Sequence, residues 1–251
     1  MPSDHRSGQR PSWPRRGFGE PVAVLAHRGG RGPWRENTLA AFAGALAAGA
    51  DGVELDVRRS ADGVAVVHHD ADVEGSGPIA VTVARELPAW LPTLAQALEV
   101  CAGAVVNVEL KLDEVESSRS KRSVTAAGAL AQAVAPALVG ARCGVVVSSF
   151  WPEVLEAASD IGAGMALALL VHPAFDAVDG LVRARALGCA ALHPHVSAVT
   201  AELVERAHDL GLGVTTWTAN EPSDVGRALA GGVDGLITDE VAATVAACRP
   251  G

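Results

Sequence analysis

Short apolar runs alternate with longer Ala- and Leu-rich stretches along this chain from residue 22 onward. Apolar runs of about four to eight residues are typical of buried strands, and apolar positions three and four apart predict helices. The predicted strands are 22–26, 51–58, 104–110, 144–149, 165–171, 190–193, 213–218 and 235–238. The predicted helices are 38–48, 93–101, 122–138, 152–159, 175–187, 200–210, 222–230 and 241–247. Strand–helix units repeated in this way predict an α/β fold, a (β/α)8 TIM barrel.

One other architecture would use the same elements. An open, doubly wound parallel sheet also alternates strands and helices, but no Gly-x-Gly-x-x-Gly motif follows a predicted strand. The one long excursion, residues 71–92, lies between the second strand and the second helix and is rich in Gly and Pro. We expect a short insertion there, over one mouth of the barrel.

Composition and charge narrow the class of protein. The chain is 49% hydrophobic and 20% charged with a formal net charge of −9, which argues against a nucleic-acid-binding surface. No run approaches the ~18 apolar residues of a membrane span, and no apolar secretory signal is visible. The cysteines form no CxxC pair, so we expect reduced thiols. These features predict a soluble cytoplasmic protein without integral membrane association; a mature secreted form that has lost its signal is the alternative.

The first 20 residues differ from the rest because they combine several arginines with proline and glycine. This composition predicts a disordered N-terminal tail over residues 1–20, which is either a functional arm or a tag or start-site remnant. One barrel domain, residues 21–251, would follow it.

Charged side chains stand where the apolar runs end. His27 follows the first run, Glu54 and Asp56 lie in the second, and Glu109 and Lys111 close the third. Residues two apart on a strand point to the same side, and barrel active sites lie at the carboxyl ends of the strands. Burying charged groups is unfavourable unless they are paired or bind a ligand, so their presence at buried strand ends indicates a function. We therefore expect these side chains to meet at one mouth of the barrel.

A predicted β-hairpin brings a second histidine to the same place. Asp62-Gly63 is a strong hairpin-turn signal. A two-residue loop there pairs Asp56 with His69, on the same side as Glu54, and a loop moved back by one residue pairs Glu54 with His69. A three-residue loop would put His69 on the opposite face. The favoured turn chemistry thus predicts that His69 joins the carboxylates.

Three carboxylates at one place suggest a metal site. Glu54, Asp56 and Glu109 offer hard oxygen ligands, which suit Mg²⁺ or Ca²⁺ better than Zn²⁺. The alternative is that Glu54 and Asp56 form ion pairs with arginines such as Arg28 or Arg58. Arg28 can instead grip a phosphate through two parallel hydrogen bonds, and the glycines after it allow close backbone approach.

Other polar residues allow two interpretations each. Lys111 is a phosphate contact or a salt-bridge partner of Glu109. Trp217 ends the seventh strand, where an indole either walls an alcohol pocket or packs in the core. Glu36 either ties down Arg28 or is a simple charge at a helix N-terminus. Four further histidines near strand ends are interpreted as structural: His68, His172, His193 and His195.

The motifs, taken in order, resemble a known family. They are His-Arg-Gly at 27–29, Glu-Asn-Thr at 36–38, Gly-Ala-Asp-Gly-Val-Glu-Leu-Asp-Val at 49–57, Asp-Gly at 62–63, Val-Val-His-His-Asp at 66–70, Pro-Thr-Leu at 92–94, Asn-Val-Glu-Leu-Lys at 107–111, Trp-Thr-Ala-Asn at 217–220 and Gly-Val-Asp-Gly-Leu-Ile-Thr-Asp at 232–239. This ordered set is similar to the glycerophosphodiester phosphodiesterases and spans nearly the whole chain after residue 22.

The resemblance implies a (β/α)8 barrel and metal-dependent hydrolysis of glycerophosphodiesters to sn-glycerol 3-phosphate and an alcohol. The implied acid/base pair is His27 and His69. The implied metal ligands are Glu54, Asp56 and Glu109. The implied phosphate contacts are Arg28 and Lys111. The nucleophile is either water or the 2-hydroxyl group of the substrate's glycerol.

Two features depart from the family pattern. Arg35 stands where members usually have proline before the Glu-Asn-Thr, and the 71–92 stretch is diverged and short. The alcohol preference is therefore open. A lysophospholipase D or sphingomyelinase D is one rival function, although the chain has only 4 Phe and 5 Trp to build a lipid-docking surface. A non-catalytic barrel that binds phosphodiesters is the other.

Overall fold

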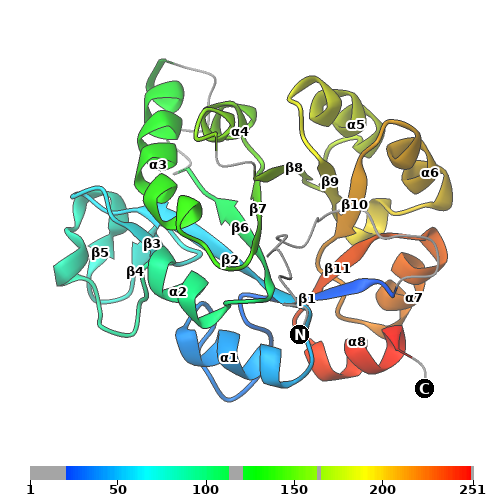
Figure 1. Ribbon diagram of the computed structural model, residues 1–251, viewed down its shortest axis with the longest axis horizontal. Helices are drawn as coiled ribbons and strands as arrows, with labels where there is room; N and C mark the ends of the chain where they lie inside the picture. Colours follow the sequence, from blue (N-terminus) through cyan, green and yellow to red (C-terminus); the bar gives the residue numbers. More distant parts are fainter. Residues whose placement is uncertain (1–20, 113–120, 163–164, 250–251) are drawn as a thin grey trace, which may run out of the picture.

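The computed structural model describes residues 21–112, 121–162 and 165–249, and within them parallel strands close into a barrel surrounded by helices (Figure 1). The barrel strands are β1 Ala23–His27, β2 Gly52–Arg59, β6 Val105–Leu110, β7 Gly144–Ser149, β8 Ala166–Val171, β9 Ala191–Pro194, β10 Gly213–Thr216 and β11 Gly235–Thr238. β1 pairs with both β2 and β11, so the ring closes between the first and last strands. The predicted (β/α)8 barrel is confirmed.

The helices form the outer layer. They are α1 Leu39–Ala47, α2 Leu94–Val100, α3 Lys121–Val139, α4 Pro152–Ser159, α5 Ala177–Ala186, α6 Ala201–Asp209, α7 Pro222–Gly231 and α8 Val241–Cys248. Local chemistry fixes several ends. Thr93 and Gln96 form a capping box at the start of α2. Asp176 caps α5, so this helix begins two residues after the predicted start and Phe175 lies outside it.

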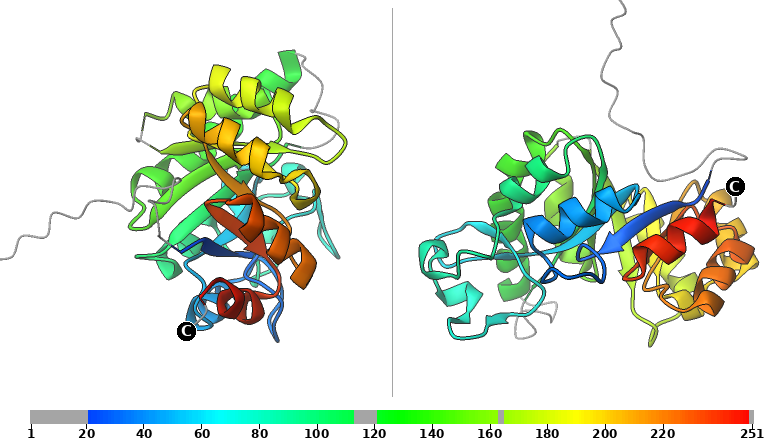
Figure 2. Two further views of the ribbon diagram at one scale, coloured as in Figure 1. Left: turned by 90° about the vertical axis from the view of Figure 1, so that its right-hand side faces the viewer. Right: turned by 90° about the horizontal axis from the view of Figure 1, so that it is seen from below.

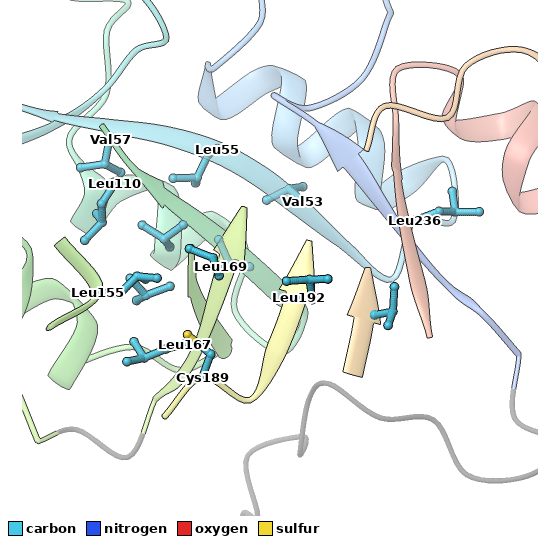
Figure 3. Close-up of a cluster of buried hydrophobic side chains, with 14 of the residues drawn as sticks. Val53, Leu55, Val57, Leu110, Leu155, Leu167, Leu169, Cys189, Leu192 and Leu236 are labelled. Carbon is cyan, nitrogen blue, oxygen red and sulfur yellow. The ribbon is translucent and has the colours of Figure 1, made fainter. Parts of the chain in front are cut away.

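Alternation along β2 separates an apolar outer face from a polar interior. Val53, Leu55 and Val57 point outward and pack with side chains of the helix layer (Figure 3). Glu54 and Asp56, at the intervening positions, therefore point into the barrel. The same alternation in the neighbouring strand brings Glu109 inside, since it lies in register with Asp56.

The excursion after β2 is folded. β3 Ala65–Val67 runs antiparallel to β2, and two short strands, β4 Asp72–Val73 and β5 Gly77–Pro78, pair with each other. Two single-turn 3-10 helices follow at Ile79–Val81 and Ala84–Glu86. A separate small core holds this insertion together, and it extends to one side of the barrel (Figure 2). Its members are Val66, Val73, Ile79, Leu87 and Leu91.

The predicted register of the hairpin is wrong. Val57 pairs with Val67 and Arg59 with Ala65, so the connecting loop has three residues and His68, rather than His69, lies opposite Asp56. The His68 N–H donates to the Asp56 carbonyl at 3.0 Å. His69 still reaches the barrel mouth because β3 ends at Val67, and strict alternation no longer applies beyond it.

The cause of the longer loop is Ser60. Its Oγ accepts a hydrogen bond from the Val64 N–H at 3.0 Å and donates to Asp62 Oδ1 at 2.7 Å. Gly63 takes the left-handed conformation with φ 81°. A three-residue hairpin loop requires a residue in that conformation, and glycine adopts it without strain.

Among the described residues, the helices are too short or too polar to cross a membrane. The cytoplasmic location stays a prediction. The predicted disordered tail, residues 1–20, lies outside the described part of the chain.

Candidate active site at the carboxyl ends of the strands

A cavity of about 170 Å³ opens at the carboxyl ends of the barrel strands. Seven of the eight predicted site residues line it: His27, Arg28, Glu54, His69, Glu109, Lys111 and Trp217. The eighth, Asp56, is 1% exposed and contacts the lining residues Arg28 and Lys111. The structure thus brings the predicted residues together.

Glu54, Asp56 and Glu109 form a compact acidic cluster. One carboxylate oxygen of each lies within 4.8 Å of the other two. Oxygen ligands of a shared Mg²⁺ or Ca²⁺ lie about 2.0–2.6 Å from the ion, so they stand no more than about 5 Å apart. Glu54 Oε1 is buried and has no hydrogen-bond partner in the described part of the chain. The cluster therefore fits a divalent cation.

Burial and mutual repulsion oppose the charge on these carboxylates. Burial and the nearby Asp56 charge raise the pKa of Glu54 to about 8. Burial likewise raises the pKa of Glu109, although Lys111 partly offsets this. Burial would also raise the pKa of Asp56, but the cations Lys111 and Arg28 outweigh it and hold that pKa below its usual value. A bound cation would favour ionisation of the first two groups.

Asp56 is held by two cationic side chains and one amide donor. Lys111 Nζ lies 3.2 Å from its Oδ1 and Arg28 Nε lies 3.2 Å from its Oδ2. Asn37 Nδ2 donates to Oδ2 at 2.9 Å. The ion pair with Arg28 considered from the sequence is thus present, alongside membership of the acidic cluster. Arg58 has a different role, since its Nε donates to the backbone carbonyl of His69 at 2.8 Å.

Arg28 and Lys111 bring positive charge to the cavity. Lys111 Nζ lies 3.0 Å from Glu109 Oε1, so the salt-bridge interpretation of Lys111 matches its contacts. Arg28 Nη1 lies 3.1 Å from Glu36 Oε1, so Glu36 does tie down Arg28. Arg28 adopts a left-handed conformation with φ 53°, which is rare for a non-glycine residue and is often found at functional sites.

His27 is oriented by a carboxylate that the sequence reasoning did not single out. His27 Nδ1 lies 2.8 Å from Asp239 Oδ1, and Asn220 Nδ2 donates to Asp239 Oδ2 at 2.6 Å. The other ring nitrogen, Nε2, lies 4.0 Å from Glu54 Oε2. Burial lowers the pKa of His27, but the Asp239 hydrogen bond and the Glu54 charge outweigh it, so the pKa is raised. The sequence reasoning missed Asp239 and Asn220 as site residues, although they lie in the 232–239 and 217–220 motifs, which were a signal for them.

His69 has a similar arrangement. Its Nδ1 lies 2.7 Å from Asp70 Oδ1, and Arg58 holds its backbone. Burial, assisted by the nearby Lys111 charge, lowers the pKa of His69. In each histidine a carboxylate occupies Nδ1, which leaves Nε2 available to a bound substrate.

Trp217 packs against neighbouring side chains at the cavity, and its role as the wall of an alcohol pocket stays a prediction. It lines the cavity, and its indole Nε1 donates to the His193 carbonyl at 2.9 Å. Its ring also meets Phe150 edge-on with centroids 5.5 Å apart. His68 packs against Trp90 in the insertion, away from the cavity lining. His193 is 1% exposed, and neither ring nitrogen has a hydrogen-bond partner among the described residues.

Fold and site together define a TIM-barrel protein whose carboxylates, imidazoles and cationic side chains share one cavity at the carboxyl ends of the strands. The sequence profile of the glycerophosphoryl diester phosphodiesterase family matches residues 27–243. The chain belongs to this family, and the resemblance expected from its motifs is confirmed.

Individual relatives agree over nearly their whole lengths. A glycerophosphodiester phosphodiesterase of Caldanaerobacter subterraneus is 29% identical over 91% of this chain and 98% of its own. A phosphodiesterase of Oleispira antarctica, solved with the product sn-glycerol 3-phosphate, is 28% identical with a TM-score of 0.78 over 90% of this chain and 96% of its own. A glycerophosphodiester phosphodiesterase of Thermotoga maritima is 28% identical with a TM-score of 0.73, over 89% of this chain and 97% of its own. Glycerophosphodiester phosphodiesterase is therefore the enzyme class of this chain.

Proposed function

We propose that this protein hydrolyses glycerophosphodiesters to sn-glycerol 3-phosphate and an alcohol, with a divalent cation held by the acidic cluster and with His27 and His69 transferring protons. The observation that carries this proposal is the single cavity lined by both imidazoles and by Glu54 and Glu109. The product bound to the Oleispira antarctica relative supports the glycerol phosphate half of the reaction.

The charged groups of the cavity match a phosphodiester. Glu54, Asp56 and Glu109 would hold Mg²⁺ or Ca²⁺, which when bound supplies positive charge that stabilises the nonbridging phosphate oxygens. Arg28 and Lys111 bind the same oxygens through charge-assisted hydrogen bonds. Trp217 forms an apolar wall for the carbon groups on either side of the phosphate.

The two histidines supply the proton transfers. Asp239 and Asp70 each hold one Nδ1, and this fixes both rings with Nε2 free. One ring accepts the proton of the attacking hydroxyl group, which belongs to water or to the 2-hydroxyl of the substrate's glycerol. The other ring donates a proton to the departing alcohol oxygen.

The first prediction concerns the histidines. Replacing His27 or His69 by alanine lowers kcat for glycerophosphocholine by roughly 10²–10⁴-fold, because each ring carries one proton transfer. Release of glycerol 3-phosphate measures the rate, and circular dichroism and thermal unfolding check the fold. His68→Ala is the matched control, since this ring packs on Trp90 outside the cavity lining and should leave the rate near that of the wild type.

Near wild-type rates in either the His27 or the His69 variant would refute the assignment. Turnover of micellar lysolipid alone would instead favour a lysophospholipase D or sphingomyelinase D. Binding of glycerophosphocholine without any turnover, in the presence of Mg²⁺ or Ca²⁺, would favour a non-catalytic barrel.

A further inference from the structure

A second and larger cavity, of about 590 Å³, lies between α4 and α5 next to the catalytic cavity. Phe150 and Leu170 line both cavities, so a group attached to a phosphate in the first cavity reaches the second past these two side chains. α4 and α5 are consecutive helices around the rim (Figure 1). The position of this cavity is suited to the alcohol half of a diester.

Aromatic rings form much of its wall. Phe150 meets the rings of Trp151 and His172 edge-on, with centroids 6.3 and 6.5 Å apart. His172 in turn meets Phe175 at 6.3 Å. Phe175 is 69% exposed, which is unusual for a large apolar side chain. Ring faces of this kind attract cations, and clusters of them bind quaternary ammonium groups.

A carboxylate without a partner in the described part of the chain lines the same cavity. Glu153, in the first turn of α4, is 7% exposed and has neither a hydrogen bond nor an ion pair to any described residue. A carboxylate that faces a cavity without a protein partner would be stabilised by a cation bound there. Asp176 and Asp179 add two carboxylates to the lining against the single cation Arg183. The cavity is therefore aromatic and net negative.

We propose that this aromatic–acidic groove, defined by Phe150, Trp151, Glu153, His172 and Phe175, binds a leaving alcohol that carries a quaternary ammonium group, as choline does. The inference rests on the proposed function, since the phosphate of such a substrate lies in the catalytic cavity. Glu153 neutralises the positive charge and the rings contact the methyl groups.

Other occupants match the groove less well. A primary ammonium group would donate to the carboxylates but brings no methyl groups to the aromatic rings of the wall. An acyl chain carries no charge and would shield Glu153 from water without pairing its charge. A quaternary ammonium group combines the charge that the carboxylate needs with the apolar surface that the rings favour.

The test compares substrates that differ only in the alcohol. The wild type should show a higher kcat/KM for glycerophosphocholine than for glycerophosphoethanolamine or glycerophosphoglycerol. In Glu153→Gln the preference for the choline ester over the glycerol ester should fall about tenfold, mainly through KM. Asp179→Asn, at an exposed position, should lower the same ratio by less and guards against misfolding of the first variant. Glu156→Gln, on the exposed side of α4, is the control and should keep the wild-type ratio.

A binding measurement separates this inference from the proposed function. Choline chloride alone should quench tryptophan fluorescence of the wild type and Glu156→Gln, and much less that of Glu153→Gln. Choline binding that needs Glu153, without hydrolysis of any diester, would support the groove and overturn the proposed function. Hydrolysis with the same substrate ratio in Glu153→Gln as in the wild type, and choline binding that does not need Glu153, would overturn the groove alone.

Discussion

Glu54 and Asp56 lie two residues apart on β2, but their pKa values are shifted in opposite directions. They lie on the same face of β2 and both are almost fully buried. Lys111 and Arg28 contact Asp56 and lower its pKa, whereas burial and repulsion raise the pKa of Glu54 to about 8. Protonation at neutral pH is therefore decided by the nearest cation and not by position on the strand. A metal ion bound beside Glu54 would therefore lower its pKa and favour the ionised carboxylate.

The second prediction concerns the buried side chain of His193. Burial lowers its pKa to about 3, so the folded state keeps it neutral whereas the unfolded state protonates near pH 6.5. Its contribution to stability is complete above about pH 6.5 and is lost as the pH falls toward 3. Between pH 7 and pH 5 this group lowers the free energy of unfolding by about 2 kcal/mol.

Urea unfolding of the wild type and of His193→Gln at both pH values measures the difference. The variant should lose about 2 kcal/mol less than the wild type over this interval. Equal losses in the two proteins would show that His193 does not carry the acid sensitivity.

At the scale of single elements, the barrel strands and helices were predictable but the hairpin was not. Apolar runs identify the barrel strands because buried parallel strands are apolar on the outer face and need few polar groups inside. The register of β2 with β3 depends on the Ser60 hydroxyl, whose contacts with Asp62 and Val64 stabilise a three-residue loop. Side-chain hydrogen bonds of this kind leave no periodic signal in a sequence. The orienting role of Asp239 was missed for a related reason, since it depends on the closure of β1 against β11.

The third prediction tests this turn. Ser60→Ala should lower the free energy of unfolding by about 0.5–1.5 kcal/mol, because the partly buried Val64 N–H loses its hydrogen bond to Ser60 Oγ. It should also reduce kcat, since His69 lies only two residues beyond the end of β3 and a shifted register would move it. Ser76→Ala, in the turn between β4 and β5, is the control and should change neither quantity. Chemical denaturation and the glycerol 3-phosphate assay check both. An unchanged stability in Ser60→Ala would contradict this account of the loop.

For the whole molecule, a cation held by the acidic cluster would couple metal binding to stability. Glu54 and Asp56 come from β2 and Glu109 from β6, so an ion held by all three bridges neighbouring strands. A ligand that binds only the folded state stabilises it by about 2.7 kcal/mol at 100 times its dissociation constant.

The fourth prediction follows from this coupling. Adding Mg²⁺ or Ca²⁺ to chelator-treated protein should raise Tm, and the rise should disappear in Glu109→Gln. Glu99→Gln, on the surface of α2, should keep it. Differential scanning calorimetry measures the shift and identifies the preferred ion. The same rise in Glu109→Gln as in the wild type would place the ion elsewhere.

The contact between His27 and Asp239 spans 212 positions of sequence. During translation, Glu54, Asp56 and Glu109 are therefore synthesised well before Asp239. Asp239, which orients His27, follows β11. A nascent chain that ends before that point contains His27 and His69 but lacks the carboxylate that holds the His27 ring. The His27–Asp239 contact can therefore form only after β11 has been synthesised and can pair with β1.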